Sequence, residues 1–375
     1  MTLSRRIFGA ATLSALSSRM PAAAADAEPP AASSHPRPRQ KPRPGKIDVH
    51  SHFLPEVYQS ALAAAGISQP DGMSAVPAWS AEAALAAMDR LGIATQMLSI
   101  SSPGIHLDKS GDLAATVRLA RQVNEAGADI VRKHPGRFGF FAITPLPDVG
   151  TAVAEACHSL DVLKADGIVL ETNFHGAYLG NARLAPLFAV LNERAAVVFI
   201  HPTSPACPCC APAGQEAAVH AASAGYPRPM LEFMFETTRT VTDMVLSGVL
   251  DRYPNIKVIV PHAGAALPVL AGRVELMAPS LGTVDGKPRP GMRDAMRKLH
   301  FDLAGVPVPE LLEALLKVAD PSRLHYGSDF PFTPVEACEV LLAALDQTPL
   351  LEGGLREKAM HGNSAQLFPR LVAAR

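Results

Sequence analysis

Five side chains of the types that bind metal ions stand at the ends of apolar runs in this sequence. His50 and His52 close the run IDVHSH, His201 closes VVFIH, His262 follows VIVP, and Asp329 follows LHYGS. If these runs are β-strands, His50 and His52 project to the same side of the first strand, one pleat apart, and can share one metal ion. An H-x-H pair alone is a weak signal. The other three residues strengthen it, because all five would lie at the carboxyl ends of strands.

Bringing five strand ends together requires a particular fold. Short apolar runs alternate eight times with segments of helical periodicity between residue 46 and about residue 345. The predicted strands are 46–53, 93–99, 138–143, 167–171, 196–201, 257–261, 299–303 and 324–328. The predicted helices are 80–91, 113–134, 150–164, 182–194, 229–252, 265–277, 308–318 and 334–345. Eight such units predict an α/β fold, a (β/α)8 TIM barrel with its site at the carboxyl ends of the strands. The rival, a doubly wound sheet, lacks a G-x-G-x-x-G motif after the first strand.

Several segments resemble the amidohydrolase superfamily, and the resemblance extends over almost the whole chain after residue 46. GIVLETNFHGAYLGNARLAPLF, VVFIHPTSP, YGSDFPFTP and HGNSAQLF are similar to its amidohydrolase-2 branch, the aminocarboxymuconate semialdehyde decarboxylase-like enzymes. Within that branch the sequence looks most like the 6-methylsalicylate decarboxylase-like group. We therefore expect the TIM barrel to be of the metal-dependent amidohydrolase type.

The resemblance also implies roles for the five residues. It makes His50, His52, His201 and Asp329 the metal ligands, and His262 the acid/base histidine. Binuclear members of the superfamily bridge two metals with a carboxylated lysine on the fourth strand. Here that strand reads GIVLETN, without lysine, which indicates a mononuclear site. Glu171 in this strand is open to three interpretations: a buried polar partner, a residue that hydrogen-bonds a ligand, or an additional ligand.

The chemistry of this ligand set is consistent with catalysis. Three neutral imidazoles and one carboxylate leave a divalent ion with net positive charge and with positions open to water or substrate. Such an ion lowers the pKa of bound water to about 7 or polarises a substrate oxygen. Zn²⁺ favours an imidazole-rich set, and Mn²⁺ is the second choice where the substrate brings oxygen donors. His262, which is not needed as a ligand, can exchange a proton with bound water or substrate.

Two reactions can use the same residues. In a non-oxidative decarboxylation, a small aromatic or dienoic acid such as 6-methylsalicylate receives a proton from His262 or Asp329 at the carbon that bears the carboxylate, and CO₂ leaves. In the alternative, a metal-dependent hydrolase opens a lactone, ester or amide. The resemblance favours the carboxy-lyase. A third hypothesis, a barrel that only binds a ligand, conflicts with the intact set of five residues.

Substrate binding is predicted for one arginine and three phenylalanines. Arg239 lies where related decarboxylases place an arginine that reaches a neighbouring subunit's site, and its guanidinium can hold both oxygens of a carboxylate. This implies a homodimer or a multiple of dimers, although Arg239 is also typical of a solvated helix surface. Phe53 and Phe330, together with Phe332, could form a wall for an aromatic ring or could simply pack in the core.

The N-terminal 45 residues do not fit the barrel pattern. Residues 1–27 combine Arg5 and Arg6, an apolar run and a final A-D-A, which is typical of a secretory signal peptide with a twin-arginine-like motif. Residues 28–45 are rich in proline and arginine and predict a disordered linker before the barrel domain, 46–375. We therefore expect a periplasmic or secreted bacterial protein. The net charge of −1 and the short apolar runs argue against nucleic-acid binding and against a membrane span.

Cysteines are not expected to take part in catalysis. Cys207, Cys209 and Cys210 form a C-x-C-C run, but neither a second cysteine pair nor a nearby histidine completes a closed four-ligand site. Export would allow a disulfide within this run or between chains. Cys157 and Cys338 lie in predicted helices and are interpreted as small buried side chains.

Overall fold

The computed structural model describes residues 45–107, 112–205 and 226–373. Its central feature is one sheet of eight strands that are adjacent in chain order and all parallel. The strands are β1 (Lys46–His52), β2 (Ile93–Ser99), β3 (Phe138–Ile143), β4 (Gly167–Glu171), β7 (Val197–His201), β8 (Lys257–Val260), β11 (His300–Asp302) and β12 (Leu324–His325). Bridges from Asp48 to Tyr326 and from Ser51 to Phe330 join the last segment to the first. The predicted (β/α)8 barrel is confirmed.

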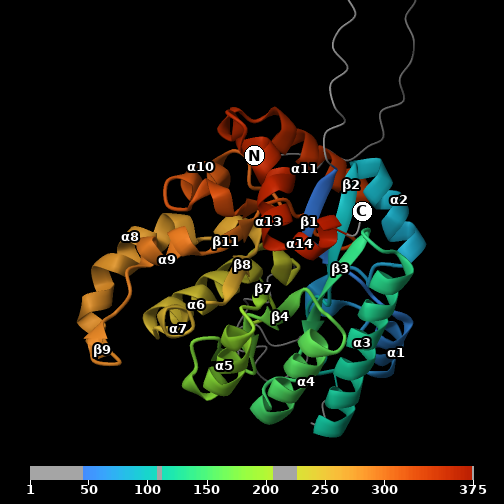
Figure 1. Ribbon diagram of the computed structural model, residues 1–375, viewed down its shortest axis with the longest axis horizontal. Helices are drawn as coiled ribbons and strands as arrows, with labels where there is room; N and C mark the ends of the chain where they lie inside the picture. The colour runs from blue at the N-terminus through green and yellow to red at the C-terminus, as the bar shows by residue number, and fades with distance from the viewer. Residues whose placement is uncertain (1–44, 108–111, 206–225, 374–375) are drawn as a thin grey trace, which may run out of the picture. The chain divides into compact units, whose positions relative to one another are not determined.

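Helices connect the strands and pack outside them (Figure 1). The helices are α1 (Glu56–Ala64), α2 (Ala81–Leu91), α3 (Leu113–Lys133), α4 (Val149–Asp161), α5 (Ala185–Glu193), α6 (Glu232–Leu246), α7 (Val249–Arg252), α8 (Leu267–Met277), α9 (Met292–Lys298), α10 (Glu310–Leu316), α11 (Val335–Gln347), α12 (Leu355–Glu357), α13 (Asn363–Leu367) and α14 (Pro369–Ala373). Side-chain caps mark where α2, α3 and α4 begin. In α2, for example, the Ser80 side chain accepts a hydrogen bond from the N–H of Ala83, and Gly92 ends the helix at φ 66°. None of the helices in the described ranges is long and apolar enough to cross a membrane.

The structure differs from the predicted elements where local backbone geometry intervenes. The predicted helix 229–252 is divided, because Gly248 adopts φ 76° between α6 and α7. The predicted strand 324–328 ends at His325. Two short hairpins, β5–β6 (Asn173–Phe174 and Ala177–Tyr178) and β9–β10 (Thr283–Val284 and Lys287–Pro288), were not predicted.

Two predictions concern residues that the structure does not describe. The predicted signal peptide (1–27) and nearly all of the predicted linker (28–45) lie outside the described residues. Cys207, Cys209 and Cys210 lie outside them as well. Cys157 and Cys338 are free thiols within α4 and α11.

A buried polar network around Asp48 connects β1, β2 and the segment after β12. Asp48 is fully buried, and its carboxylate accepts hydrogen bonds from the Ser328 hydroxyl at 2.6 Å, from Gln96 Nε2 at 3.1 Å and from two backbone N–H groups, those of Ser328 and His50. Burial raises the pKa of Asp48 to about 6, and these hydrogen bonds offset part of that rise. The network ties β1 to the segment that carries Asp329.

Candidate metal centre and active site

Four of the five predicted residues converge at the carboxyl ends of the strands. Their ligand atoms all lie within 4.8 Å of one another, in a group that could hold a metal ion: His50, His52, His201 and Asp329. The three histidines are buried and the Asp329 side chain is 22% exposed. The structure therefore brings these residues together, as the sequence predicted. His50 and His52 lie on β1, His201 on β7 and Asp329 in the segment after β12.

The hydrogen bonds of His52 define which of its nitrogens faces the group. The Ser99 hydroxyl donates its single proton to the backbone oxygen of Ser51, at 3.0 Å. It must therefore accept from His52 Nδ1, which lies 3.1 Å away. Burial lowers the pKa of His52, so the ring is favoured in its neutral form. A neutral ring with its proton on Nδ1 presents a lone pair on Nε2 toward Asp329 Oδ1, at 3.1 Å.

His50 is oriented in the same manner by a different acceptor. Its Nδ1 donates to Asp302 Oδ2 at 2.9 Å, and its Nε2, 3.5 Å from Asp329 Oδ1, has no hydrogen-bond partner among the described residues. Burial lowers the pKa of His50, but the carboxylates of Asp302 and Asp329 outweigh burial and raise the pKa to about 10. The surroundings of Nε2 thus favour a positive charge, which a proton or a metal cation can supply.

The remaining two ligands complete a set that suits a divalent cation. Burial, and then the neighbouring His52, hold the pKa of His201 well below its usual range, and no residue that the structure describes is a hydrogen-bond partner of its buried Nδ1. Burial would raise the pKa of Asp329, but the imidazoles of His50 and His52 hold it well below its usual range. The neutral imidazoles of His52 and His201, the ionised carboxylate of Asp329 and the preference for a positive charge at His50 Nε2 fit the donor set of a divalent metal.

A tight turn brings Asp329 against β1. Its backbone N–H donates to the His50 oxygen at 2.8 Å, and its φ of 61° lies in the left-handed region. Gly327 permits the close approach, because a Cβ at this position would lie 2.8 Å from the Cβ of His50. A left-handed aspartate costs backbone free energy, and such strain is often found at functional sites.

His262 lies beside the four ligands without joining their group. Its ring centroid is 5.0 Å from that of His50, and its buried Nδ1 has no hydrogen-bond partner within the described part of the chain. Burial, and then the charge on His50, lower the pKa of His262 to about 4. The ring is therefore neutral around pH 7 and can accept a proton from a molecule bound beside it.

A cavity of about 430 Å³ opens directly onto these residues. His201, His262 and Asp329 line one part of it, with Asp71, Ser101, Ser102 and Thr333. The rest of the wall is largely apolar and includes Met73, Met230, Phe233, Met234, Val306, Leu311 and Phe332. A cavity that combines these polar side chains with a largely apolar lining suits a small molecule with one polar edge.

The structure separates the three aromatic candidates. Phe332 lines the cavity, with its ring centroid 5.5 Å from that of His52. Phe53 is not among the lining residues, because side chains alternate along a strand and the one after His52 points the opposite way, toward Trp79. Phe330 is buried in the core and is also outside the lining.

Arg239 is held on the surface of α6. Its guanidinium forms an ion pair with Glu236, with an N–O distance of 2.6 Å, and its side chain is 55% exposed. Glu236 is fully buried and also accepts hydrogen bonds from Asn173 and Tyr178, on the β5–β6 hairpin. Arg239 does not line the cavity of its own chain.

Glu171 faces a second, smaller cavity. This space of about 200 Å³ is also lined by His106, His175 and Thr203. Glu171 is 6% exposed, and its Oε1 has no hydrogen-bond partner. Burial raises its pKa to about 8, while a hydrogen bond from Thr203 offsets part of the rise. Glu171 is not in the ligand group, so the structure favours the interpretation of a buried polar residue.

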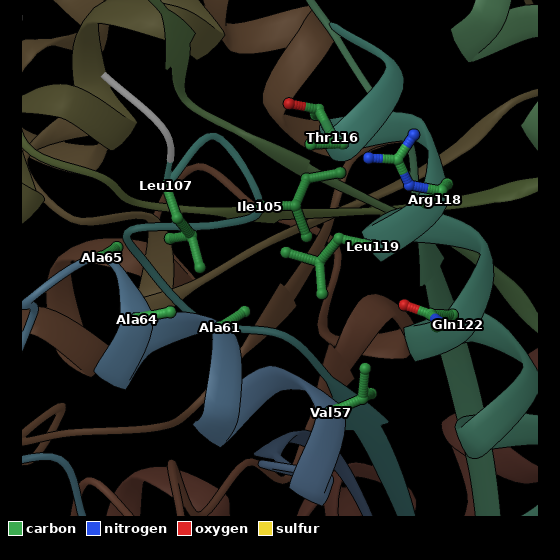
Figure 2. A pocket seen from close by; sticks show the side chains of 11 residues that line it. Val57, Ala61, Ala64, Ala65, Ile105, Leu107, Thr116, Arg118, Leu119 and Gln122 are labelled. Atoms are coloured by element: carbon green, nitrogen blue, oxygen red, sulfur yellow. The ribbon is translucent and has the colours of Figure 1, made fainter. Parts of the chain in front are cut away.

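A third cavity lies away from these groups. It has a volume of about 530 Å³ and lies between α1 and α3, with Val57 and Ala61 facing Leu119 across it (Figure 2). Arg118 and Gln122 are the longest polar side chains along its α3 side. Among the residues that the structure describes, its lining contains no histidine, cysteine, aspartate or glutamate. This cavity therefore has no counterpart of the metal-ligand chemistry described above.

Sequence reasoning missed Asp302 and Ser99, which orient the two β1 histidines. Asp302 is the last residue of β11, a position equivalent to those that singled out His201 and Asp329. A buried acid at a strand end was therefore a usable signal. Ser99 ends β2 and pairs with His52 in the sheet, but a serine at that place carries no comparable signal in one sequence.

Comparisons with known proteins agree with this geometry. The model of the amidohydrolase family matches residues 47–370. A decarboxylase of Penicillium terrestre is 36% identical over 332 residues, covering 87% of this chain and 95% of its own. The 6-methylsalicylic acid decarboxylase of Aspergillus aculeatus is 37% identical over 336 residues, covering 88% and 97%. The crystal structure of an amidohydrolase II superposes with a TM-score of 0.78 at 33% identity, covering 86% of this chain and 99% of the other.

These comparisons overturn one expectation. The N-terminal segment predicted a bacterial protein exported by the twin-arginine route to the periplasm. The relatives at 36–37% identity are fungal decarboxylases, from Penicillium and Aspergillus species. The predicted bacterial periplasmic localisation is therefore wrong.

Proposed function

The chain belongs to the amidohydrolase family, and from this premise we propose that it is a metal-dependent, non-oxidative decarboxylase of a small aromatic carboxylic acid with an ortho hydroxyl group, such as 6-methylsalicylate. The observation that carries the proposal is the convergence of three imidazoles and one carboxylate beside a cavity with an apolar wall. The names of the relatives, decarboxylases and a 6-methylsalicylic acid decarboxylase, support the choice of reaction and substrate.

We propose one divalent ion for each chain, held by the four-residue ligand group. When bound there, it would supply a Lewis acid that draws the substrate's carboxylate and phenol oxygens to the polar end of the cavity. Zn²⁺ suits three imidazoles and one carboxylate, and Mn²⁺ is the alternative to be tested beside it.

The chain's own residues then have to move one proton. The carbon that bears the carboxylate gains a proton, its bond to the carboxylate carbon breaks, and the electron pair of that bond returns to the ring as CO₂ leaves. His262 and Asp329, both at the cavity wall, are the proposed proton carriers. Because their pKa values are lowered, both are unprotonated near pH 7, and the carrier would first take up the proton that it then delivers. The net reaction consumes one proton for each turnover, so the carrier must be reprotonated before the next substrate reacts.

The apolar wall is proposed to hold the ring and its alkyl substituent. Phe332 stands next to His52, and Met234 and Leu311 line the same space, so a ring whose carboxylate lies at the ligands would contact apolar atoms elsewhere. Burial of those ring surfaces would contribute roughly 25 cal/mol for each Å² removed from water. Phe53 and Phe330 are not part of this proposal.

Arg239 is proposed to act from a second copy of the chain. Its guanidinium is more than half exposed and lies outside the cavity of its own chain. We therefore retain the hypothesis that it holds a substrate carboxylate in a partner's cavity, within a homodimer or a multiple of dimers. An Arg239→Gln variant with a raised KM and an unchanged kcat would support this role, and unchanged kinetics would remove it.

The deciding experiment supplies 6-methylsalicylate and related ortho-hydroxybenzoates to protein loaded with Zn²⁺ or with Mn²⁺. We expect CO₂ and the corresponding phenol in equal amounts, with no reaction after chelation. A panel of lactones, esters and amides tests the hydrolytic alternative in the same assay. Turnover of a lactone without turnover of any carboxylated aromatic acid would overturn the proposal.

A further inference from the structure

Asp302 connects two parts of the site that are far apart in the sequence. It is fully buried, and its two carboxylate oxygens have different partners. Oδ2 accepts a hydrogen bond from His50 Nδ1 at 2.9 Å. Oδ1 accepts from the backbone N–H groups of His262, at 2.9 Å, and Ala304, at 3.0 Å. One side chain on β11 thus contacts a residue of β1 and the turn that follows β8.

The contact with His50 decides which nitrogen of that ring can bind a cation. An ionised carboxylate can only accept hydrogen bonds, so the proton of a neutral His50 ring must lie on Nδ1. The lone pair of Nε2 then points into the ligand group, where the atom lies 3.5 Å from Asp329 Oδ1. A histidine held in one tautomer by a carboxylate is a better metal ligand, because the ring does not have to reorient or shift its proton first.

The contact with the His262 backbone holds a turn that would otherwise be unfavourable. His262, Ala263 and Ala265 all adopt positive φ values, of 54°, 52° and 53°. Residues with a Cβ seldom take this conformation without support from their surroundings. The hydrogen bond from the His262 N–H to Asp302 Oδ1 is part of that support. It fixes the position of the His262 backbone, from which the imidazole extends.

We propose that Asp302 is a positioning residue. It holds a metal ligand, His50, and the acid/base candidate, His262, at fixed positions relative to each other. The effect on metal binding follows from the geometry alone, whereas the effect on turnover rests on the proposed decarboxylase function. Neither role requires Asp302 to touch the substrate, and it does not line the cavity.

The Asp302→Asn variant separates the two contacts. The amide oxygen of asparagine can still accept from the two backbone N–H groups, so the turn after β8 is retained. The amide NH₂ then faces His50 Nδ1 and favours the His50 tautomer that carries its proton on Nε2. In that tautomer Nε2 has no free lone pair with which to bind a metal. We expect metal affinity to fall about 10- to 100-fold, measured by competition with a chelator for Zn²⁺ or Co²⁺. Asp302→Ala should lose the backbone contacts too and also unfold at a lower denaturant concentration.

Glu155→Gln is the matched control. Glu155 is a carboxylate on α4 that is 2% exposed and accepts hydrogen bonds from Arg121, Asn124 and Ser159, none of them in the ligand group. Removing its charge should leave metal affinity as in the wild type. An Asp302→Asn variant that folds and binds metal as tightly as Glu155→Gln does would overturn the proposal.

A measurement on the wild type keeps the proposal testable if every Asp302 variant fails to fold. In ¹⁵N-histidine correlation spectra of the zinc-loaded protein, His50 should bind through Nε2 and carry its proton on Nδ1. Coordination through Nδ1 would overturn the proposal. Neither readout uses a substrate, so a protein that binds metal in this way but releases no CO₂ would overturn the proposed function and leave the role of Asp302 standing.

Discussion

His52 Nε2 and Asp329 Oδ1 lie 3.1 Å apart, although 277 residues separate them in the chain. The proton of a neutral His52 ring is committed to Ser99 on the other side of the ring, so both facing atoms are acceptors. Two acceptors at this distance are stable together only when a proton or a cation lies near both. The same reasoning applies to His50, whose Nδ1 proton is committed to Asp302. Because these acceptors hold the Nδ1 protons of both rings, the Nε2 lone pairs of His50 and His52 remain available to a cation.

Removal of the Asp329 charge should therefore remove the metal. In Asp329→Asn the side chain keeps its shape but no longer neutralises a cation, and we expect affinity for Zn²⁺ to fall by at least about 100-fold, with loss of turnover. Elemental analysis after dialysis measures the metal content. Thr333→Val is the control, because it removes only the hydrogen bond that the Thr333 hydroxyl donates to Asp329 Oδ2 at 3.2 Å and should change affinity by a few-fold at most. Equal metal content in wild type and Asp329→Asn would contradict this assignment.

His262 should affect turnover much more than metal binding. Asparagine is the preferred replacement, because it tolerates the positive φ at this position better than other residues that lack an imidazole. We expect His262→Asn to retain the metal and to lower kcat by roughly 10²- to 10⁴-fold, the usual range for a lost acid/base group. Single-turnover release of CO₂ measures the effect.

The control for His262 is another histidine whose pKa burial lowers to about 4. His106 lines the second cavity rather than the ligand cavity, so His106→Asn should keep kcat within a few-fold of the wild type. Equal loss of activity in His262→Asn and His106→Asn would contradict the assignment of His262 as the acid/base residue.

Most of this site can be predicted from the sequence, because each ligand lies at or shortly after the carboxyl end of a strand. β2, β3 and β4 have the predicted limits. Gly92 ends α2 directly before β2, and polar residues flank the buried runs of β3 and β4. The barrel then necessarily brings their ends together. The alternation rule that placed His50 and His52 on one side of β1 also places Phe53 on the other, so it already argued against Phe53 as a residue of the same cavity. The environment of Glu171 was not predictable, because it depends on loop residues such as His106 and His175 that are not constrained by the strand pattern.

Phe332 and Phe53 should differ in what they contribute. Phe332 lines the cavity, so Phe332→Ala should raise the KM for an alkylated hydroxybenzoate about 10-fold or more while the fold remains stable. Phe53 is 1% exposed and packs against Trp79, so Phe53→Ala should lower the free energy of unfolding by about 3–5 kcal/mol. Steady-state kinetics and urea unfolding of both variants distinguish the two effects. The assignment fails if Phe53→Ala raises KM without loss of stability.

Glu171 should make the protein less stable as the pH rises. Burial raises its pKa from 4.5 to about 8, so between these values the folded state holds a proton that the unfolded state has released. The unfolding free energy then falls as pH increases through this window, by up to about 5 kcal/mol at roughly 1.4 kcal/mol for each unit of pKa difference. Glu171→Gln cannot ionise, so its unfolding free energy should change less between pH 5 and 8 than that of the wild type. Urea unfolding at pH 5, 6.5 and 8 measures this, with Glu56→Gln, at an exposed position on α1, as the control that should follow the wild type. Parallel curves for the wild type and Glu171→Gln would show that the buried carboxyl group does not take up a proton on folding.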